Sequence, residues 1–187
     1  MVWELALPLS TVADLPGGRS ESDLIDACKQ GDLAAFEQIY EVHAGRMKSI
    51  AFHLLGNRTD AEDAVQEAFL KVYRGVRAFE GQSAFASWIY RILINCCHDV
   101  GRKRRRQSEQ EMDAEPAIPT DVPLQVALRH ALGRIHPGHR MVFWLFEAEG
   151  FRHSEIAAIM EMPEGTSKKW LFEAKRELKR LLMEGRS

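Results

Sequence analysis

Apolar residues recur at every third or fourth position along almost the whole chain, and no segment shows a convincing strand-like alternation. Two stripes are especially regular. The first consists of Ala61, Ala64, Val65, Ala68, Phe69 and Val72. The second consists of Phe85, Trp88, Ile89, Ile92, Leu93, Cys96 and Val100. Such spacing places the apolar side chains on one face of a helix, so we predict an all-α fold.

Capping and turn residues divide this pattern into helices. Asp23 is expected to cap a short first helix, and Gly31-Asp32 to end it and begin a second helix that runs to Leu55. The glycine of Gly56-Asn57 predicts the stop. Thr59 with Glu62 predicts a capping box for the next helix.

A long helix is expected after a loop, with Ser83 as its N-cap. Acidic residues and three prolines between Gln107 and Pro123 then predict a flexible linker. Beyond it, helices are expected near Leu124, at 141–146, at 154–160 and up to about Met183. We therefore predict two small helical domains, 21–106 and 123–187, joined by a flexible acidic linker, 107–122, and preceded by a disordered arm, 1–20.

The composition argues against several functional classes. With 187 residues, of which 45% are hydrophobic, the chain can bury a core. Its three cysteines are too few for a disulfide framework, and the adjacent Cys96 and Cys97 lack the spacing of a zinc site. No apolar run approaches the ~20 residues that span a bilayer. Without a phosphate loop or a nucleophile motif, we predict no catalytic residue, metal, cofactor or small-molecule substrate.

The charges are segregated, although the net charge is only −2. Acidic residues concentrate at 60–67 and 109–121, whereas basic residues concentrate at 102–106 and 168–180. The acidic segments predict a basic protein partner, and the basic segments predict a phosphate-bearing one. A merely solvated face is the alternative for the acidic helix.

Residues 79–106 combine three ways of holding a nucleic acid. Aromatic faces stack on unpaired bases, amides read base edges, and five consecutive basic residues, Arg102 to Arg106, hold phosphates. A single-stranded nucleic acid is the ligand that uses all three. Trp88 is expected to pack in the core, with a partly exposed stacking platform as the alternative.

The C-terminal segment has the pattern of a helix-turn-helix, with small Ala157 and Ala158 in the first helix and a second helix rich in lysine and arginine. An amphipathic helix with surface ion pairs is the alternative. Glu161 stands where such turns usually have glycine, and Ser167 stands where an apolar residue is usual.

Two stretches carry a family resemblance. DAEDAVQEAFLKVY (60–73) with FEGQSAFASWIYRILINCCHD (79–99) resembles the second region of bacterial extracytoplasmic-function (ECF) sigma factors, of the sigma-70 family. EIAAIMEMPEGTSKKWLFEAKRELKRL (155–181) resembles their fourth region. The resemblance implies an alternative sigma factor that binds core RNA polymerase, directs it to promoters and melts the minus-ten element.

The resemblance also implies sites. The partner would be core RNA polymerase, through its largest and second-largest subunits, and the acidic helix would dock on the largest subunit. The residues involved would be Asp60, Asp63, Gln66, Glu67, Phe69 and Leu70. Contacts to the minus-ten DNA would involve Phe79, Gln82, Ser83, Trp88, Arg91, Asn95, Arg102, Lys103 and Arg104. Contacts to the minus-thirty-five DNA would involve Ser154, Thr166, Lys168, Lys169, Phe172, Lys175 and Arg176.

Further implications concern partners and rivals. The resemblance implies an anti-sigma factor that binds between the two domains. It also implies a cytoplasmic protein, which that factor could hold at the inner membrane. Glu173 stands at a usually basic position, which puts the preferred upstream sequence in doubt. A stand-alone duplex-DNA regulator and a helical adaptor for a protein partner are the rival functions.

Overall fold

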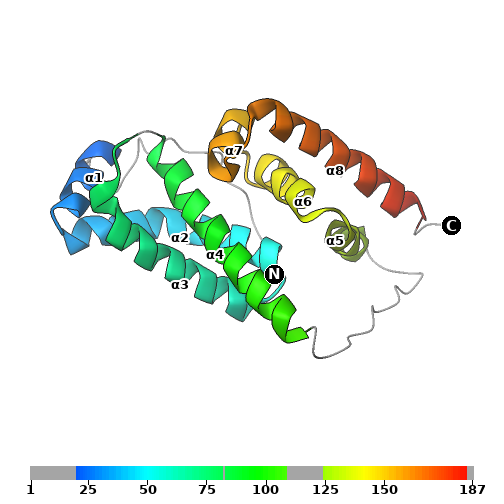
Figure 1. Cartoon of the computed structure of the whole chain (residues 1–187), viewed down its shortest axis with the longest axis horizontal. Helices are drawn as coiled ribbons and strands as arrows, with labels where there is room; N and C mark the ends of the chain where they lie inside the picture. The colour runs from blue at the N-terminus through cyan, green and yellow to red at the C-terminus, as the bar shows by residue number, and fades with distance from the viewer. Residues whose placement is uncertain (1–19, 82, 109–123, 185–187) are drawn as a thin grey trace.

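The computed structural model describes residues 20–81, 83–108 and 124–184, which form helices and no β-strand. Figure 1 shows two helical bundles lying side by side. The first contains α1 (Glu21–Lys29), α2 (Leu33–Leu55), α3 (Arg58–Gly75), the short 3-10 helix η2 (Val76–Ala78) and α4 (Phe85–Ser108). The second contains α5 (Leu124–Arg134), α6 (Pro137–Phe143), the π-helical turn η3 (Trp144–Ala148), α7 (His153–Met160) and α8 (Glu164–Glu184). The predicted all-α fold with two domains is confirmed.

The N-terminal bundle is organised by α3, which packs between α2 and α4. Both stripes predicted from the sequence face its core, where Val65, Val72, Ile89 and Leu93 are buried. Each large aliphatic side chain withdrawn from water in this way contributes roughly 1.5–3 kcal/mol to folding. The packing fixes which faces of α3 and α4 remain available to partners.

The helices begin partly as predicted. Asp32 caps α2, since its carboxylate accepts from the backbone N–H of Ala34 at 2.9 Å, and Gly56 ends that helix in the left-handed conformation. The prediction of Asp23 as a cap was wrong, because Ser20 is the N-cap of α1 and Asp23 is its capping-box partner three residues on.

Two other predicted caps were also wrong. Asn57, not Thr59, caps α3, because an amide oxygen two positions earlier already reaches the backbone N–H of Asp60 at 3.1 Å. Helix α4 begins one residue later than Ser83 would allow: the backbone N–H of Trp88 donates to the carbonyl of Ala84. At α3 the difference arises because Asn57 and Thr59 have similar capping ability and lie two residues apart.

The C-terminal bundle contains the predicted helix-turn-helix, α7 followed by α8. Helix α6 packs closely on α8 at Gly138, where a Cβ atom would lie 2.5 Å from the ring of Trp170. No larger residue fits there without displacing the indole. The apolar segment 141–146 predicted as one helix is split, because α6 ends at Phe143 and the chain continues as the π-helical turn η3.

The two bundles pack directly against each other. Helix α7 lies against α4, and η3 lies against α2. The ring of Phe151 meets that of Tyr90 at 5.1 Å between centroids, and one continuous core cluster includes buried side chains from both bundles. The sequence patterns, which describe one helix at a time, did not predict this contact. The predicted linker, 107–122, lies outside the described residues from 109 onward, whereas its first two residues belong to α4. The predicted arm, 1–20, lies outside them from 1 to 19.

A buried histidine makes the stability of the fold depend on pH. His43 is 6% exposed, and its Nδ1 lies 3.2 Å from the hydroxyl of Tyr90. Burial, with a smaller effect of the Arg46 charge, lowers the pKa of His43 from 6.5 to about 4. The unfolded state therefore binds a proton at a higher pH than the folded state does, and stability is lost as the pH falls from 6.5 toward 4.

We expect this histidine to account for a loss of about 2 kcal/mol in unfolding free energy between pH 7 and pH 4.5. Urea denaturation of the wild type and of His43→Gln at both pH values measures it, since carboxylate titrations are common to the two proteins. The variant should lose less stability on acidification. An equal loss in both proteins would refute the assignment.

Candidate nucleic-acid interface

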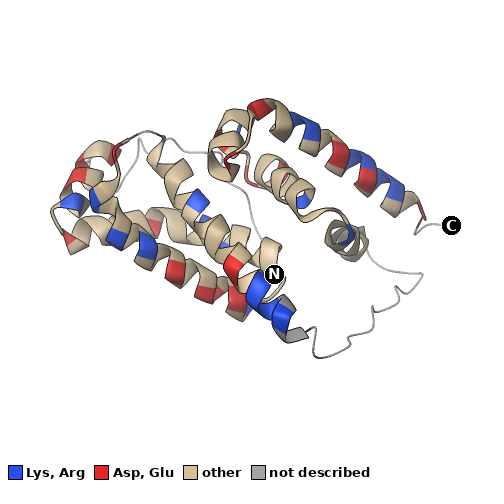
Figure 2. Ribbon diagram, in the orientation of Figure 1, with Lys and Arg blue, Asp and Glu red and all other residues tan. Residues whose placement is uncertain are grey.

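Helix α3 presents an acidic surface, which Figure 2 shows as red bands along the helix. Asp63, Gln66 and Glu67 are exposed, and Leu70 adds an apolar side chain that is 48% exposed. Asp60 is half-buried and lies 3.6 Å from the guanidinium of Arg104. The surface therefore offers negative charge around one apolar contact, which suits a basic protein partner with an apolar groove.

Phe69 does not belong to this surface. Its side chain is only 5% exposed, and its ring packs against Tyr40 and Phe36, with centroids 4.6 and 6.3 Å away. The prediction that Phe69 contacts a partner is therefore corrected: the residue is a core member that supports its neighbour Leu70. Its place in the apolar stripe of α3 was the signal that identified its true role.

The aromatic residues around the loop before α4 form one cluster. The ring centroids of Phe79, Phe85 and Trp88 lie between 5.2 and 5.6 Å from one another. A Cβ atom on Gly75 would lie 3.3 Å from the indole of Trp88. Trp88 thus packs mainly toward the core, as expected, while Phe79 and Ser83 remain half-buried at the edge of the loop. Gln82 lies outside the described residues.

The rest of α4 carries charged and polar groups toward its C-terminal end, beside the acidic end of α3 (Figure 2). Asn95, Arg102, Lys103 and Arg104 are exposed. Arg102 pairs with Asp99 one turn earlier. Most of these cations are reached by solvent and are therefore available to phosphates.

Part of α4 is covered by the C-terminal bundle. Tyr90 is 2% exposed and packs against Phe151 of that bundle, and Ser87 is 5% exposed. Arg91 is half-buried and donates to the carboxylate of Glu161, at 3.0 Å. In the middle of this helix, Asn95 is therefore exposed, whereas Arg91 is engaged within the protein.

Helix α8 carries the predicted basic surface. Lys168, Lys169, Lys175 and Arg176 are exposed, and Phe172 between them is 64% exposed. Ser154 on α7 is exposed, and Thr166 is half-buried. Several of these cations form surface ion pairs, which the alternative of an amphipathic helix predicted. Lys168 lies 2.7 Å from Glu164, Lys175 lies 2.6 Å from Glu147, and Arg176 pairs with Glu173. These exposed pairs are weak, so a phosphate can replace the acidic partner.

The two unusual residues of the turn have physical explanations. Glu161 adopts the left-handed conformation, with φ of 52°, which glycine adopts without strain. Ser167 is fully buried, and its hydroxyl lies 2.9 Å from Nδ1 of His153. The helix-turn-helix thus keeps its usual backbone and exchanges an apolar core contact for a hydrogen bond.

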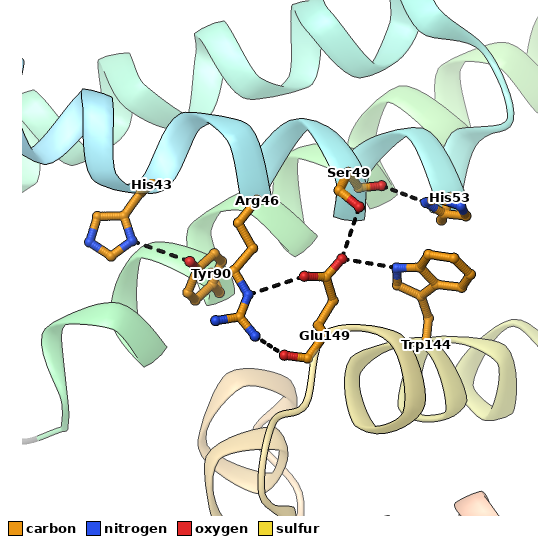
Figure 3. Close-up of polar contacts among 7 residues, drawn as sticks. All are labelled: His43, Arg46, Ser49, His53, Tyr90, Trp144 and Glu149. Carbon is orange, nitrogen blue, oxygen red and sulfur yellow. Dashed lines mark hydrogen bonds and ion pairs between the residues drawn. The ribbon is translucent and has the colours of Figure 1, made fainter. Parts of the chain in front are cut away.

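One group of polar residues was missed by sequence reasoning. Figure 3 shows Arg46, Ser49 and His53 of α2 meeting Trp144 and Glu149 of the C-terminal bundle. Glu149 is 7% exposed. The available signal was the position of Glu149 within the mainly apolar segment 141–151. Periodicity alone assigns such an acidic residue to the solvent-exposed side.

Comparison with known proteins identifies the family. The model of sigma-70 region 2 matches residues 39–107, and that of sigma-70 region 4 matches residues 125–178. The chain is 30% identical over 169 residues to the ECF RNA polymerase sigma factor SigM of Mycobacterium tuberculosis, covering 88% of this chain and 85% of SigM. The chain belongs to the ECF sigma factors. This sigma factor is therefore a transcription initiation factor of the sigma-70 family.

Further similarities agree with this assignment. The ECF RNA polymerase sigma-E factor of Escherichia coli K12 is 31% identical over 170 residues, which are 81% of this chain and 88% of that protein. The solved structure of the sigma factor RpoE of Bartonella quintana, in complex with the anti-sigma factor NepR, superposes with a TM-score of 0.64. It is 27% identical, over 79% of this chain and 96% of the other.

Two further properties concern the helices and the cysteines of the described residues. Among them, no helix is long and apolar enough to cross a membrane. Cys96 and Cys97 are both buried, and burial raises the pKa of each thiol, that of Cys97 to about 12. A thiol so protected from ionisation is a poor nucleophile and a poor redox sensor.

Proposed function

We propose that this sigma factor binds core RNA polymerase through the acidic surface of α3. Asp63, Gln66 and Glu67 would contact basic groups of the largest subunit, and Leu70 would provide the apolar contact. Asp60 stands at the edge of this surface, where Arg104 shares its charge. The exposure of four neighbouring side chains on one packed helix supports the assignment, because rigid presentation lowers the entropic cost of binding.

Melting of the minus-ten element would use the loop before α4 and the exposed groups of α4. Extruding a base from a duplex costs a few kcal/mol, which stacking and edge hydrogen bonds offset. Phe79 and Ser83 are half-buried at the edge of the loop. Gln82, which lies outside the described residues, is proposed to act with them. Trp88 would support that edge from the core side. Phosphate and base contacts would come from Arg91, Asn95, Arg102, Lys103 and Arg104.

Recognition of the minus-thirty-five element would use the helix-turn-helix. A recognition helix enters the major groove with its N-terminal residues toward base edges. In α8 these are Thr166, Lys168 and Lys169, followed by the exposed ring of Phe172. Lys175, Arg176 and Ser154 of α7 would contact phosphates at the rim. Glu173 pairs with Arg176 and so reduces the positive charge at that position.

One observation carries this function: both sigma-70 regions match this chain, in order. The first region contains the acidic helix α3, and the second contains the basic helix α8. In vitro transcription with purified core polymerase and a panel of promoters tests it. We expect promoter-dependent transcripts only when the protein is added. If the protein does not bind core polymerase at all, the proposal fails, and tight duplex binding by the free protein would instead favour a stand-alone regulator.

The protein would act without catalysing a reaction itself, in the cytoplasm, where RNA polymerase works. An anti-sigma factor is its expected regulator, since the RpoE structure it resembles contains one. Such a factor would bind between or over the two domains. The predicted linker, 107–122, would pass along the nucleic-acid channels of the polymerase, where its acidic residues would mimic RNA charge.

A further inference from the structure

A buried hydrogen bond inside the helix-turn-helix joins its two helices. Helix α7 begins at His153 and lies beside the N-terminal end of α8 (Figure 1). Nδ1 of His153 lies 2.9 Å from the hydroxyl of Ser167, which is 0% exposed and is the first buried residue of α8. Neither residue is among those proposed to contact polymerase or DNA.

The imidazole of this bond is held in place independently of α8. The ring of His153 stacks on that of Phe146 in η3, with centroids 4.5 Å apart and an interplanar angle of 24°. The backbone N–H of Arg152 donates to the carboxylate of Glu155 at 2.7 Å, which fixes the chain where it enters α7. The position of Nδ1 is therefore set by η3 and by the first turn of α7.

Ser167 lies on the opposite side of α8 from residues proposed to contact DNA. An α-helix has 3.6 residues per turn, so Lys169 and Arg176, two and nine residues after Ser167, project from the opposite face, and both are exposed. A serine side chain buries little apolar area, so packing at this position constrains the helix less than an apolar residue would. A hydrogen bond is directional, whereas apolar packing is not. The bond to His153 therefore fixes the rotation of α8 about its own axis.

A small rotation of α8 would affect base contacts more than phosphate contacts. The surface of a helix with its side chains lies about 5–6 Å from the axis, so a rotation of about 20° moves surface atoms by about 2 Å. Hydrogen bonds to base edges weaken steeply outside ~2.7–3.2 Å. Phosphate contacts are largely electrostatic and carry no sequence information directly. Loss of the bond should therefore reduce discrimination between DNA sequences more than affinity for DNA.

We propose that His153 and Ser167 are positioning residues that set the rotation of α8 and thereby the specificity for the upstream promoter element. They act through the exposed residues of α8 and touch no DNA themselves. The effect on specificity rests on the proposed function, whereas the effect on α8 follows from the contacts within the domain.

Transcription from a promoter library tests the effect on specificity. The library has a randomised upstream element and a transcribed barcode, and the protein is supplied with purified core polymerase. The readout is the ratio of transcription from the most active elements to the library median. Ser167→Ala and His153→Phe each remove the bond, and His153→Phe keeps an aromatic ring beside Phe146. We expect each to lower the ratio about ten-fold, as for the loss of one base contact. The double variant should lower it no further, because both changes remove the same interaction.

Two further variants separate positioning from stability. His153→Asn places an amide oxygen where Nδ1 lies, so it should keep the ratio within a few-fold of the wild type. Leu178→Val destabilises the same domain at a buried position away from the pair and should also keep the ratio. A ratio that stays unchanged in Ser167→Ala, or falls as far in Leu178→Val, would leave the pair a purely structural role and overturn the proposal. If Ser167→Ala does not fold by circular dichroism, His153→Phe decides alone.

Amide hydrogen exchange of the full-length protein tests the effect on α8 without polymerase or DNA. Ser167→Ala and His153→Phe should accelerate exchange at 164–171 about ten-fold, whereas Leu178→Val should act chiefly at 174–184. Unchanged exchange at 164–171 would overturn the positioning role whatever the transcription result. Accelerated exchange in a protein that does not bind core polymerase would refute the proposed function and leave the positioning of α8 intact.

Discussion

Replacing Asp63 and Glu67 together by lysine is expected to weaken binding to core RNA polymerase by about 100-fold or more. Both carboxylates are exposed on α3, four residues apart, and so share one face of the helix. Reversing them places like charges opposite a basic partner surface, which costs several kcal/mol. Fluorescence anisotropy or surface plasmon resonance with purified core polymerase measures the loss.

The matched control is Glu37→Lys with Glu41→Lys, which makes the same change of charge at two exposed residues with the same spacing on α2. Its affinity for polymerase should stay within a few-fold of the wild type. Neither double variant should alter the contribution of α8 to duplex DNA binding. Equal weakening by both variants would show that the effect comes from net charge and not from the α3 surface.

Replacing Lys168 and Lys169 by alanine is expected to lower transcription from promoters that depend on the upstream element, on the order of ten-fold. These two exposed lysines are in the first turns of α8. A lysine that enters the groove also neutralises a neighbouring phosphate, so the loss of both lysines should reduce the slope of log affinity against log salt by about 2, because each neutralised phosphate contributes about 0.9. Holoenzyme binding to an active promoter over a series of salt concentrations measures the slope.

Lys179→Ala with Arg180→Ala is the control for this experiment. Both residues are exposed at the far end of the same helix, away from the turn that leads into it. Transcription and the salt slope should both remain near the wild-type values. A slope that falls equally in the two variants would place the DNA elsewhere along α8.

Much of the fold could be predicted because the spacing of apolar residues indicates which face of a helix packs into the core of its own domain. The apolar stripes of 61–72 and 85–100 are buried largely as expected, and Gly56 ends α2 in the conformation that glycine favours. The errors in capping had a local cause. Ser20 and Asn57 occupy the cap positions of α1 and α3 because several polar residues near each helix start compete for the same backbone donors.

The site was predicted less completely than the fold. The acidic surface of α3 and the basic surface of α8 followed from charge along single helices, and both are exposed. Phe69 was placed on a binding surface although its spacing already assigned it to the core. The burial of Tyr90 could not be predicted, because its ring packs against Phe151, which lies more than fifty positions away.

The sequence by itself determined the helices, the two domains and the family, because each depends on residues within one segment or on the order of two segments. The contact between the domains was decided only by the tertiary structure. Arg46 and Glu149 lie 103 positions apart, and neither stands in a pattern that distinguishes it from an ordinary surface charge. A pair of this kind has no periodicity, since it depends on where two separately folded surfaces meet.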